Sequence, residues 1–73
     1  MAQRSLQVVI YREDDSFVAQ CLNVDVARDG PTAEAARENL REALELYFDE
    51  PGAGADFQQV AEAQIEQLTL KGA

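Results

Sequence analysis

The sequence predicts a two-layer α+β domain of βββαβ type, in which a mainly antiparallel sheet carries one helix on one face. Short alternating apolar runs fill the first part of the chain, a long segment with helical spacing follows, and a second alternating stretch lies near the end. With 73 residues, the whole of 1–73 is expected to form a single domain. A domain this small buries about 60% of its unfolded surface, so many gain further burial by oligomerising.

The first three elements are expected to be strands. Segments 6–11 and 17–22 are short and rich in β-branched and aromatic residues. The polar residues 12–16 between them predict a hairpin, and the lack of glycine there favours a longer loop built on a type I turn over a two-residue turn. Asn23 tolerates a bend, after which 24–28 is expected to form a weaker third strand.

One face of this sheet must meet the helix, and the sequence leaves open which one. If the helix covers the face of Phe17, the other face is rather apolar for solvent and invites a partner. The residues expected on that open face are Gln7, Val9, Tyr11, Val18 and Leu22.

A turn and a cap separate the third strand from the helix. Gly30 allows backbone angles that other residues avoid, and Pro31 cannot continue a strand ladder. Thr32 is suited to cap the helix that follows.

The helix is predicted from Ala33 to about Asp49. Apolar residues recur along one face at a spacing of 3.6, namely Ala36, Leu40, Ala43, Leu44, Tyr47 and Phe48. Arg41 and Glu45 are spaced to form an i,i+4 ion pair on the polar side. The Pro-Gly pair at 51–52 ends the helix.

The stretch 57–70 fits two structures. A helix would align Phe57, Ala61, Gln64, Ile65 and Leu68 only loosely. A strand would align Ala61, Ala63 and Ile65, and then Leu68 and Leu70 after a bulge. A strand is favoured, returning beside the first strand and parallel to it through a right-handed crossover.

Charge and composition restrict the function. The net charge is −8, and the basic residues are scattered: Arg4, Arg12, Arg28, Arg37, Arg41 and Lys71. Direct binding to nucleic acid or to an anionic membrane needs clustered cations, so neither is expected. A basic protein partner is electrostatically favoured, although the same charge also serves solubility alone.

The remaining composition argues against a cofactor, a metal or an export route. With one cysteine and no histidine, the chain has no internal disulfide and lacks the commonest metal ligand and acid–base group. Cys21 is expected to be a packed apolar residue. The first residues lead into no secretory segment and no run is long enough to cross a membrane, so a cytoplasmic location is expected.

No enzymatic activity is expected. Two-metal phosphoryl chemistry needs converging carboxylates, and 6–11 carries none. Asp14 and Asp15 lie in the expected turn, where charged residues are ordinary. An enzyme would instead show metal-dependent activity that is lost on neutralising Asp25 or Asp29.

Two stretches carry a family resemblance. Segment 17–22 precedes Asp-Gly-Pro-Thr-Ala-Glu-Ala at 29–35, and Asn-Leu-Arg-Glu-Ala follows at 39–43. Over about 8–50 the chain resembles the N-terminal domain of HicB-type antitoxins. The resemblance implies a partial ribonuclease-H-like βββαβ fold that binds and masks a small, basic, RNA-cleaving HicA-type toxin. Two departures are Leu22-Asn23, where the family often has a proline, and the lack of the usual C-terminal DNA-binding domain within 73 residues, so operator binding is not expected.

The expected toxin-docking residues lie at the end of the helix: Glu42, Glu45, Asp49 and Glu50. They put negative charge where the helix dipole is already negative, and a basic partner would relieve this. The alternative for the same residues is a solvated acidic face. The alternative function is a stand-alone homo-oligomeric structural or small-ligand-binding domain with no toxin partner.

Overall fold

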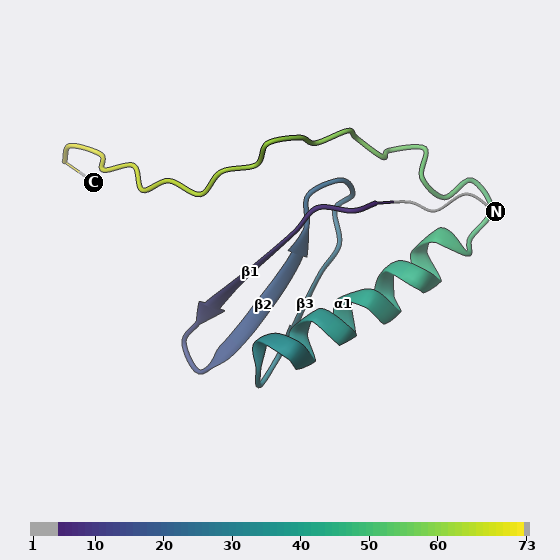
Figure 1. Ribbon diagram of the computed structural model, residues 1–73, viewed down its shortest axis with the longest axis horizontal. Coiled ribbons are helices and arrows are strands. Elements are labelled where there is room, and N and C mark those ends of the chain that lie inside the picture. The colour runs from purple at the N-terminus through teal and green to yellow at the C-terminus, as the bar shows by residue number, and fades with distance from the viewer. Residues whose placement is uncertain (1–4, 73) are drawn as a thin grey trace.

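A computed structural model of the chain, described for residues 5–72, has three antiparallel strands and one helix that covers one face of the sheet (Figure 1). The strands are β1 (Val8–Glu13), β2 (Ser16–Cys21) and β3 (Ala27–Gly30), in the order β1-β2-β3, and the helix is α1 (Ala33–Phe48). The predicted α+β class is confirmed. Arg4, one of the basic residues, and the rest of the first four residues lie outside the described part.

The β1–β2 hairpin is tighter than predicted. Glu13 and Ser16 pair directly, so Asp14 and Asp15 form a two-residue turn. The expected longer loop is wrong because Asp14 takes the left-handed conformation, with φ of 55°, which aspartate tolerates better than most residues. The turn therefore needs no glycine.

The third strand starts later than predicted. Instead of 24–28, β3 spans Ala27–Gly30, because Val24 turns inward and is only 5% exposed. Asn23 before it is buried, and both polar atoms of its side chain have hydrogen-bond partners. Its Oδ1 accepts the backbone N–H of Gln7 at 2.7 Å, and its Nδ2 donates to the carbonyl of Gln58 at 2.7 Å. Asn23 thus fastens the start of β1 and the start of the tail to one point.

Helix α1 forms as its sequence predicts. Thr32 is the N-cap, with its Oγ1 accepting the N–H of Ala35 at 3.0 Å. Asp49 is the C-cap. The apolar stripe faces the sheet, with Ala36, Leu40 and Leu44 buried, as predicted.

The helix meets the sheet face of Phe17, Ala19 and Cys21. Ala19 and Cys21 are buried and form the core cluster together with Val24, Ala36, Leu40 and Leu44. Cys21 is a packed, free thiol, as predicted. Gly30 serves this packing rather than an unusual φ, because a Cβ there would lie 2.7 Å from the backbone nitrogen of Ala36.

The predicted last strand is not part of the sheet. Residues 57–70 are extended and pair with no strand in the described chain (Figure 1). Glu62 breaks the run with a φ of 57°, and Ile65 and Leu68 are three residues apart, so a regular strand would point them to opposite sides. The radius of gyration is 14.3 Å, against about 11 Å for a compact chain of this length, because this tail projects.

Candidate functional site

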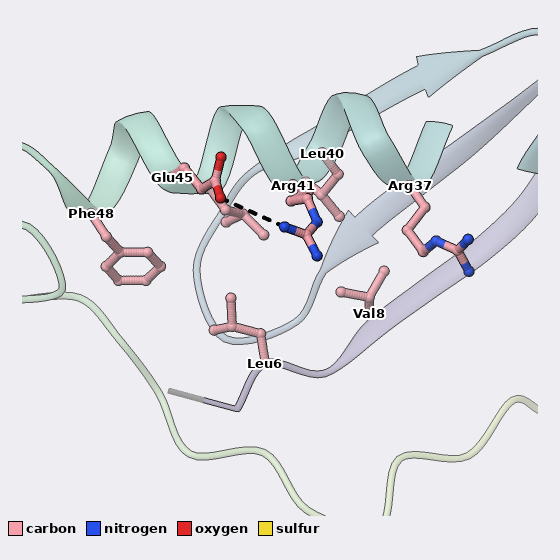
Figure 2. A pocket seen from close by; sticks show the side chains of 8 residues that line it. Leu6, Val8, Arg37, Leu40, Arg41, Glu45 and Phe48 are labelled. Carbon is pink, nitrogen blue, oxygen red and sulfur yellow. Dashed lines mark ion pairs between the residues drawn. The ribbon is translucent and has the colours of Figure 1, made fainter. Parts of the chain in front are cut away.

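A strongly apolar groove of about 420 Å³ lies between β1 and α1. We call it the β1–α1 groove. Its walls are Leu6, Val8, Arg37, Leu40, Arg41, Leu44, Glu45 and Phe48. Figure 2 shows the side chains of Leu6 and Val8 facing the helix, with Arg37 at one end of the groove and Phe48 at the other.

The groove exists because of the hairpin register. Val8 is opposite Cys21 and Ile10 is opposite Ala19, so Val8 and Ile10 share the helix-facing side of the sheet. Val8 lies at the margin of this side, where the helix no longer covers it, and is 40% exposed. The exposed side chain of Val8 thus forms part of an apolar recess beside the helix.

The two ends of the groove differ in charge. Arg37 lies at the end near the start of the helix, Phe48 lies at the end near its finish, and Arg41 and Glu45 lie between them (Figure 2). Arg41 pairs with Glu45 at 3.7 Å, as predicted, and with Glu38 at 3.8 Å. These pairs are about two-thirds exposed, so each contributes only a few tenths of a kcal/mol.

The groove opens onto an uncovered sheet edge. In the order β1-β2-β3, the outer side of β1 has no strand beside it in residues 5–72. Such an edge presents a row of unpaired backbone N–H and C=O groups over Val8–Glu13. An extended segment can pair with these groups while it inserts alternate side chains into the groove.

Of the predicted docking residues on the helix, Glu42 lies on the side away from the core, and Glu45 lies at the flank of that side, where it also lines the β1–α1 groove. Glu42, Glu45 and Asp49 are exposed and follow one another at i, i+3 and i+7, so they form one stripe. We call these three the acidic helix face. Glu50 follows the C-cap and is exposed in the turn. Among residues 5–72, Glu45 is the only one of the four that makes an ion pair, with Arg41, and no basic residue lies in the last helical turn.

The sheet face away from the helix carries the residues expected to invite a partner. Val9, Val18 and Leu22 are half-buried, and Tyr11 is 40% exposed. Residues 63–65 of the tail pass over one corner of this face and enclose a recess with Gln7, Val9 and Leu22. The open face is therefore partly covered by the chain's own tail.

The base of the tail is fastened to the helix end. The hydroxyl of Tyr47 donates a short hydrogen bond to Oδ1 of Asp56. This bond raises the pKa of Tyr47 above the usual tyrosine value, and desolvation and the negative charge of Asp56 act in the same direction. Phe57 packs on Phe48 with ring centroids 6.4 Å apart. From Gln59 to Gly72 the structure describes no further side-chain hydrogen bond or ring contact, and residues 63–65 only border the recess of Gln7, Val9 and Leu22.

The sequence did not reveal the groove. Its apolar residues were expected in the core, and Arg37 was one of the scattered cations. The signal that points to it is the pair Arg37 and Arg41, which places two of the six basic residues one turn apart on one helix flank.

Other kinds of site have no counterpart in the described chain. Within residues 5–72, no three Cys, Asp or Glu side chains gather as metal ligands would. Asp25 and Asp29 are exposed, the first in the loop before β3 and the second in β3. No helix in this part of the chain has the length and apolarity that a membrane crossing requires.

Comparison with known proteins identifies no relative: no family model, no curated protein and no solved structure matches this chain.

Proposed function

We propose that this chain is a cytoplasmic protein-binding module that resembles a HicB-type antitoxin and masks a small, basic, RNA-cleaving toxin. The observation that carries the proposal is the acidic helix face. Glu42 and Asp49 have no cationic partner in residues 5–72, and the net charge of the chain is −8. A surface of this kind attracts a basic protein and speeds its association.

The mechanism is occlusion. A toxin that cleaves RNA must present cations to the phosphate backbone. The carboxylates of the acidic helix face would pair with those cations and so occupy the surface that RNA needs. The unfavourable contact of Asp49 with the negative end of the helix dipole would be relieved in the complex. No chemical step by this chain is involved.

Co-expression with a HicA-type toxin from the same source tests this proposal. The expected result is a stable complex in which RNA cleavage is suppressed. Glu42→Lys with Asp49→Lys should weaken toxin binding about tenfold or more, because two attractive pairs become repulsive. Glu13→Lys with Asp15→Lys changes the net charge equally at the far hairpin and should leave binding within about threefold. A complex that ignores both pairs of substitutions would contradict docking on the acidic helix face, and no complex at all would contradict the antitoxin role.

A second candidate is a stand-alone homo-oligomeric domain. The observation that favours it is apolar surface without a cover: the β1–α1 groove, and the tail residues Ile65, Leu68 and Leu70, which are 84%, 82% and 63% exposed. A small domain with that much exposed apolar surface gains stability by association. Light scattering on the purified chain separates the candidates, because a tight oligomer that does not bind the toxin favours the second one.

A further inference from the structure

We propose that the β1–α1 groove receives the tail of a second copy of this chain, so that two copies exchange residues 62–70. This inference rests on the second candidate function, homo-oligomerisation, and names the segment and the surface that carry it. It is independent of the toxin.

The tail has one face that matches the groove. In an extended segment alternate residues share a side, so Glu62, Glu66, Leu68 and Leu70 point the same way. This face has two carboxylates followed by two leucines. The groove has Arg37 at one end, the Arg41–Glu45 ion pair next to it and apolar side chains at the other end. Arg37, which makes no ion pair within residues 5–72, and the apolar end match the pattern of the tail, and Arg41 would exchange Glu45 for a carboxylate of the tail.

The lengths also agree. Glu66 to Leu70 covers about 13 Å as a strand. From Arg37 to Phe48 the helix covers about 16 Å. A tail with Glu66 beside the arginines therefore places Leu68 and Leu70 against Leu44 and Phe48.

The chain direction that the groove requires is opposite to that of the molecule's own tail, so the tail that binds must come from another copy. Placing the carboxylates at the arginines requires the tail to run parallel to α1, which is antiparallel to β1 (Figures 1 and 2). The chain's own tail starts where Gln58 is bonded to Asn23, near the start of β1, and runs in the same direction as β1 (Figure 1). Lying along its own groove, it would bring the carboxylates to Phe48 and the leucines to Arg37.

The chain's own tail also lies on the wrong side of β1. Its residues 63–65 contact the recess of Gln7, Val9 and Leu22, on the sheet face away from the helix. A tail from a second copy can approach in the opposite direction and pair antiparallel with the open edge of β1. If each copy gives and receives a tail, the contact closes with twofold symmetry.

Charge explains why the contact is specific. Two chains of net charge −8 repel one another, so association needs local pairing of opposite charges. Arg37 makes no ion pair with any of residues 5–72, and Arg41 pairs only at 3.7–3.8 Å on an exposed surface. Both can meet Glu66 of the incoming tail, and Glu62 lies about 13 Å before it, beyond the Arg37 end of the groove. The left-handed φ of 57° at Glu62, which L-residues rarely adopt, is also released when the tail straightens.

Charge exchange between two variants tests the proposal, with mass in solution measured by light scattering. Wild type is expected to be a dimer. Arg37→Glu with Arg41→Glu, and separately Glu62→Lys with Glu66→Lys, should each weaken dimerisation at least about tenfold, because groove and tail then carry like charges. An equal mixture of the two variants should form a 1:1 heterodimer, because one of its tail–groove contacts is wild type and the other has both signs reversed. Asp15→Lys with Asp25→Lys changes the net charge as the tail variant does, at exposed loop positions, and should leave the dimer unchanged.

A second pair of variants tests the apolar part without risk to the core. Leu68→Asp with Leu70→Asp should give a folded monomer, whereas Leu46→Asp, at a helix position that is 71% exposed and outside the groove, should stay dimeric. A wild-type monomer would overturn both the exchange and the homo-oligomeric candidate. A dimer that is indifferent to all tail variants would overturn the exchange alone and point to another contact between copies.

Discussion

The two edges of the sheet are built differently. At the β3 edge, the Nδ2 of Asn39 donates to the carbonyl of Asp29 at 2.9 Å, and the helix backbone approaches Gly30 so closely that no Cβ fits. At the β1 edge, no strand or helix covers the outer side within the described chain, and Val8 remains 40% exposed.

This difference shows which strands of the sheet a single helix can cover. A single helix is about 10 Å wide, and three strands at about 4.8 Å spacing make a sheet about as wide as the helix can cover. Here α1 leans on β3, to which it is joined by a short turn, so the uncovered strip falls at β1. Contacts at the β3 edge stabilise the fold, whereas the backbone groups of the β1 edge are available for binding.

The largest expected effect comes from the residue between the two edges. Leu40→Ala should lower the free energy of unfolding by about 2–5 kcal/mol, because Leu40 is 1% exposed and its removal leaves a cavity. Val8→Ala at the open edge should cost less than about 1 kcal/mol, because Val8 is already 40% exposed. Urea denaturation of both variants in a Leu68→Asp, Leu70→Asp chain, which lacks the proposed tail contact, measures the contrast. Equal losses there would mean that another part of the chain covers the β1 edge.

The next effect belongs to the closed edge. Gly30→Ala should destabilise the fold by about 1–3 kcal/mol, since the new methyl group would lie 2.7 Å from the nitrogen of Ala36 and backbone has to move. Ala27→Gly at the other end of β3 is a control for backbone entropy, at about 0.5–1 kcal/mol. Thermal unfolding followed by circular dichroism compares them. A neutral Gly30→Ala would show that helix and strand are less closely packed than the structure has them.

A smaller effect is expected from the side chain that ties the helix to β3. Asn39→Ala removes one exposed hydrogen bond and should cost about 0.5–1.5 kcal/mol. Glu42→Ala, at an exposed helix position outside the groove, should change stability by less than about 0.5 kcal/mol. Hydrogen exchange of the β3 amides should accelerate in the first variant only.

The smallest effect concerns the base of the tail. In a Tyr11→Phe chain, Tyr47 is the only tyrosine, and its pKa should lie above the usual value of 10.0 because neutral Tyr47 donates to Asp56. The stabilisation from this bond is present below the pKa of the unfolded chain and is lost as pH rises through the folded pKa. Asp56→Asn should lower the pKa of Tyr47 towards its usual value. Ultraviolet titration of tyrosinate measures both chains, and identical curves would contradict the contact.

Local sequence signals predicted those elements whose causes are local. Thr32 caps the helix, the apolar stripe from Ala36 to Phe48 sets its inner face, and the pair Arg41–Glu45 follows from helical spacing alone. The hairpin strands were predicted for the same reason, although the turn at Asp14 depends on a left-handed conformation that the residue type permits without requiring. The acidic stripe was also predictable, because three carboxylates at i, i+3 and i+7 must share a helix face.

The features that involve two distant segments were not predictable in this way. The sequence predicts only a bend at Asn23. The folded chain brings the backbone of Gln7 and Gln58 to the side-chain amide of Asn23. Both faces of the β1–β2 hairpin carry apolar residues. Which face is buried therefore depends on packing against α1. The tail was expected to be a strand, yet a strand needs a partner edge, and that is a property of the tertiary structure.

The sequence by itself therefore determined the helix, its cap, the hairpin strands, the acidic helix face and the net charge, because each depends on neighbours within a few residues. Only the tertiary structure decided which edge of the sheet is closed, that Arg37, Arg41 and Val8 line one groove, and that residues 57–70 pair with no strand of the described chain. The reason is physical: burial and pairing join residues that are far apart in the chain, and their free energies depend on the whole packed arrangement.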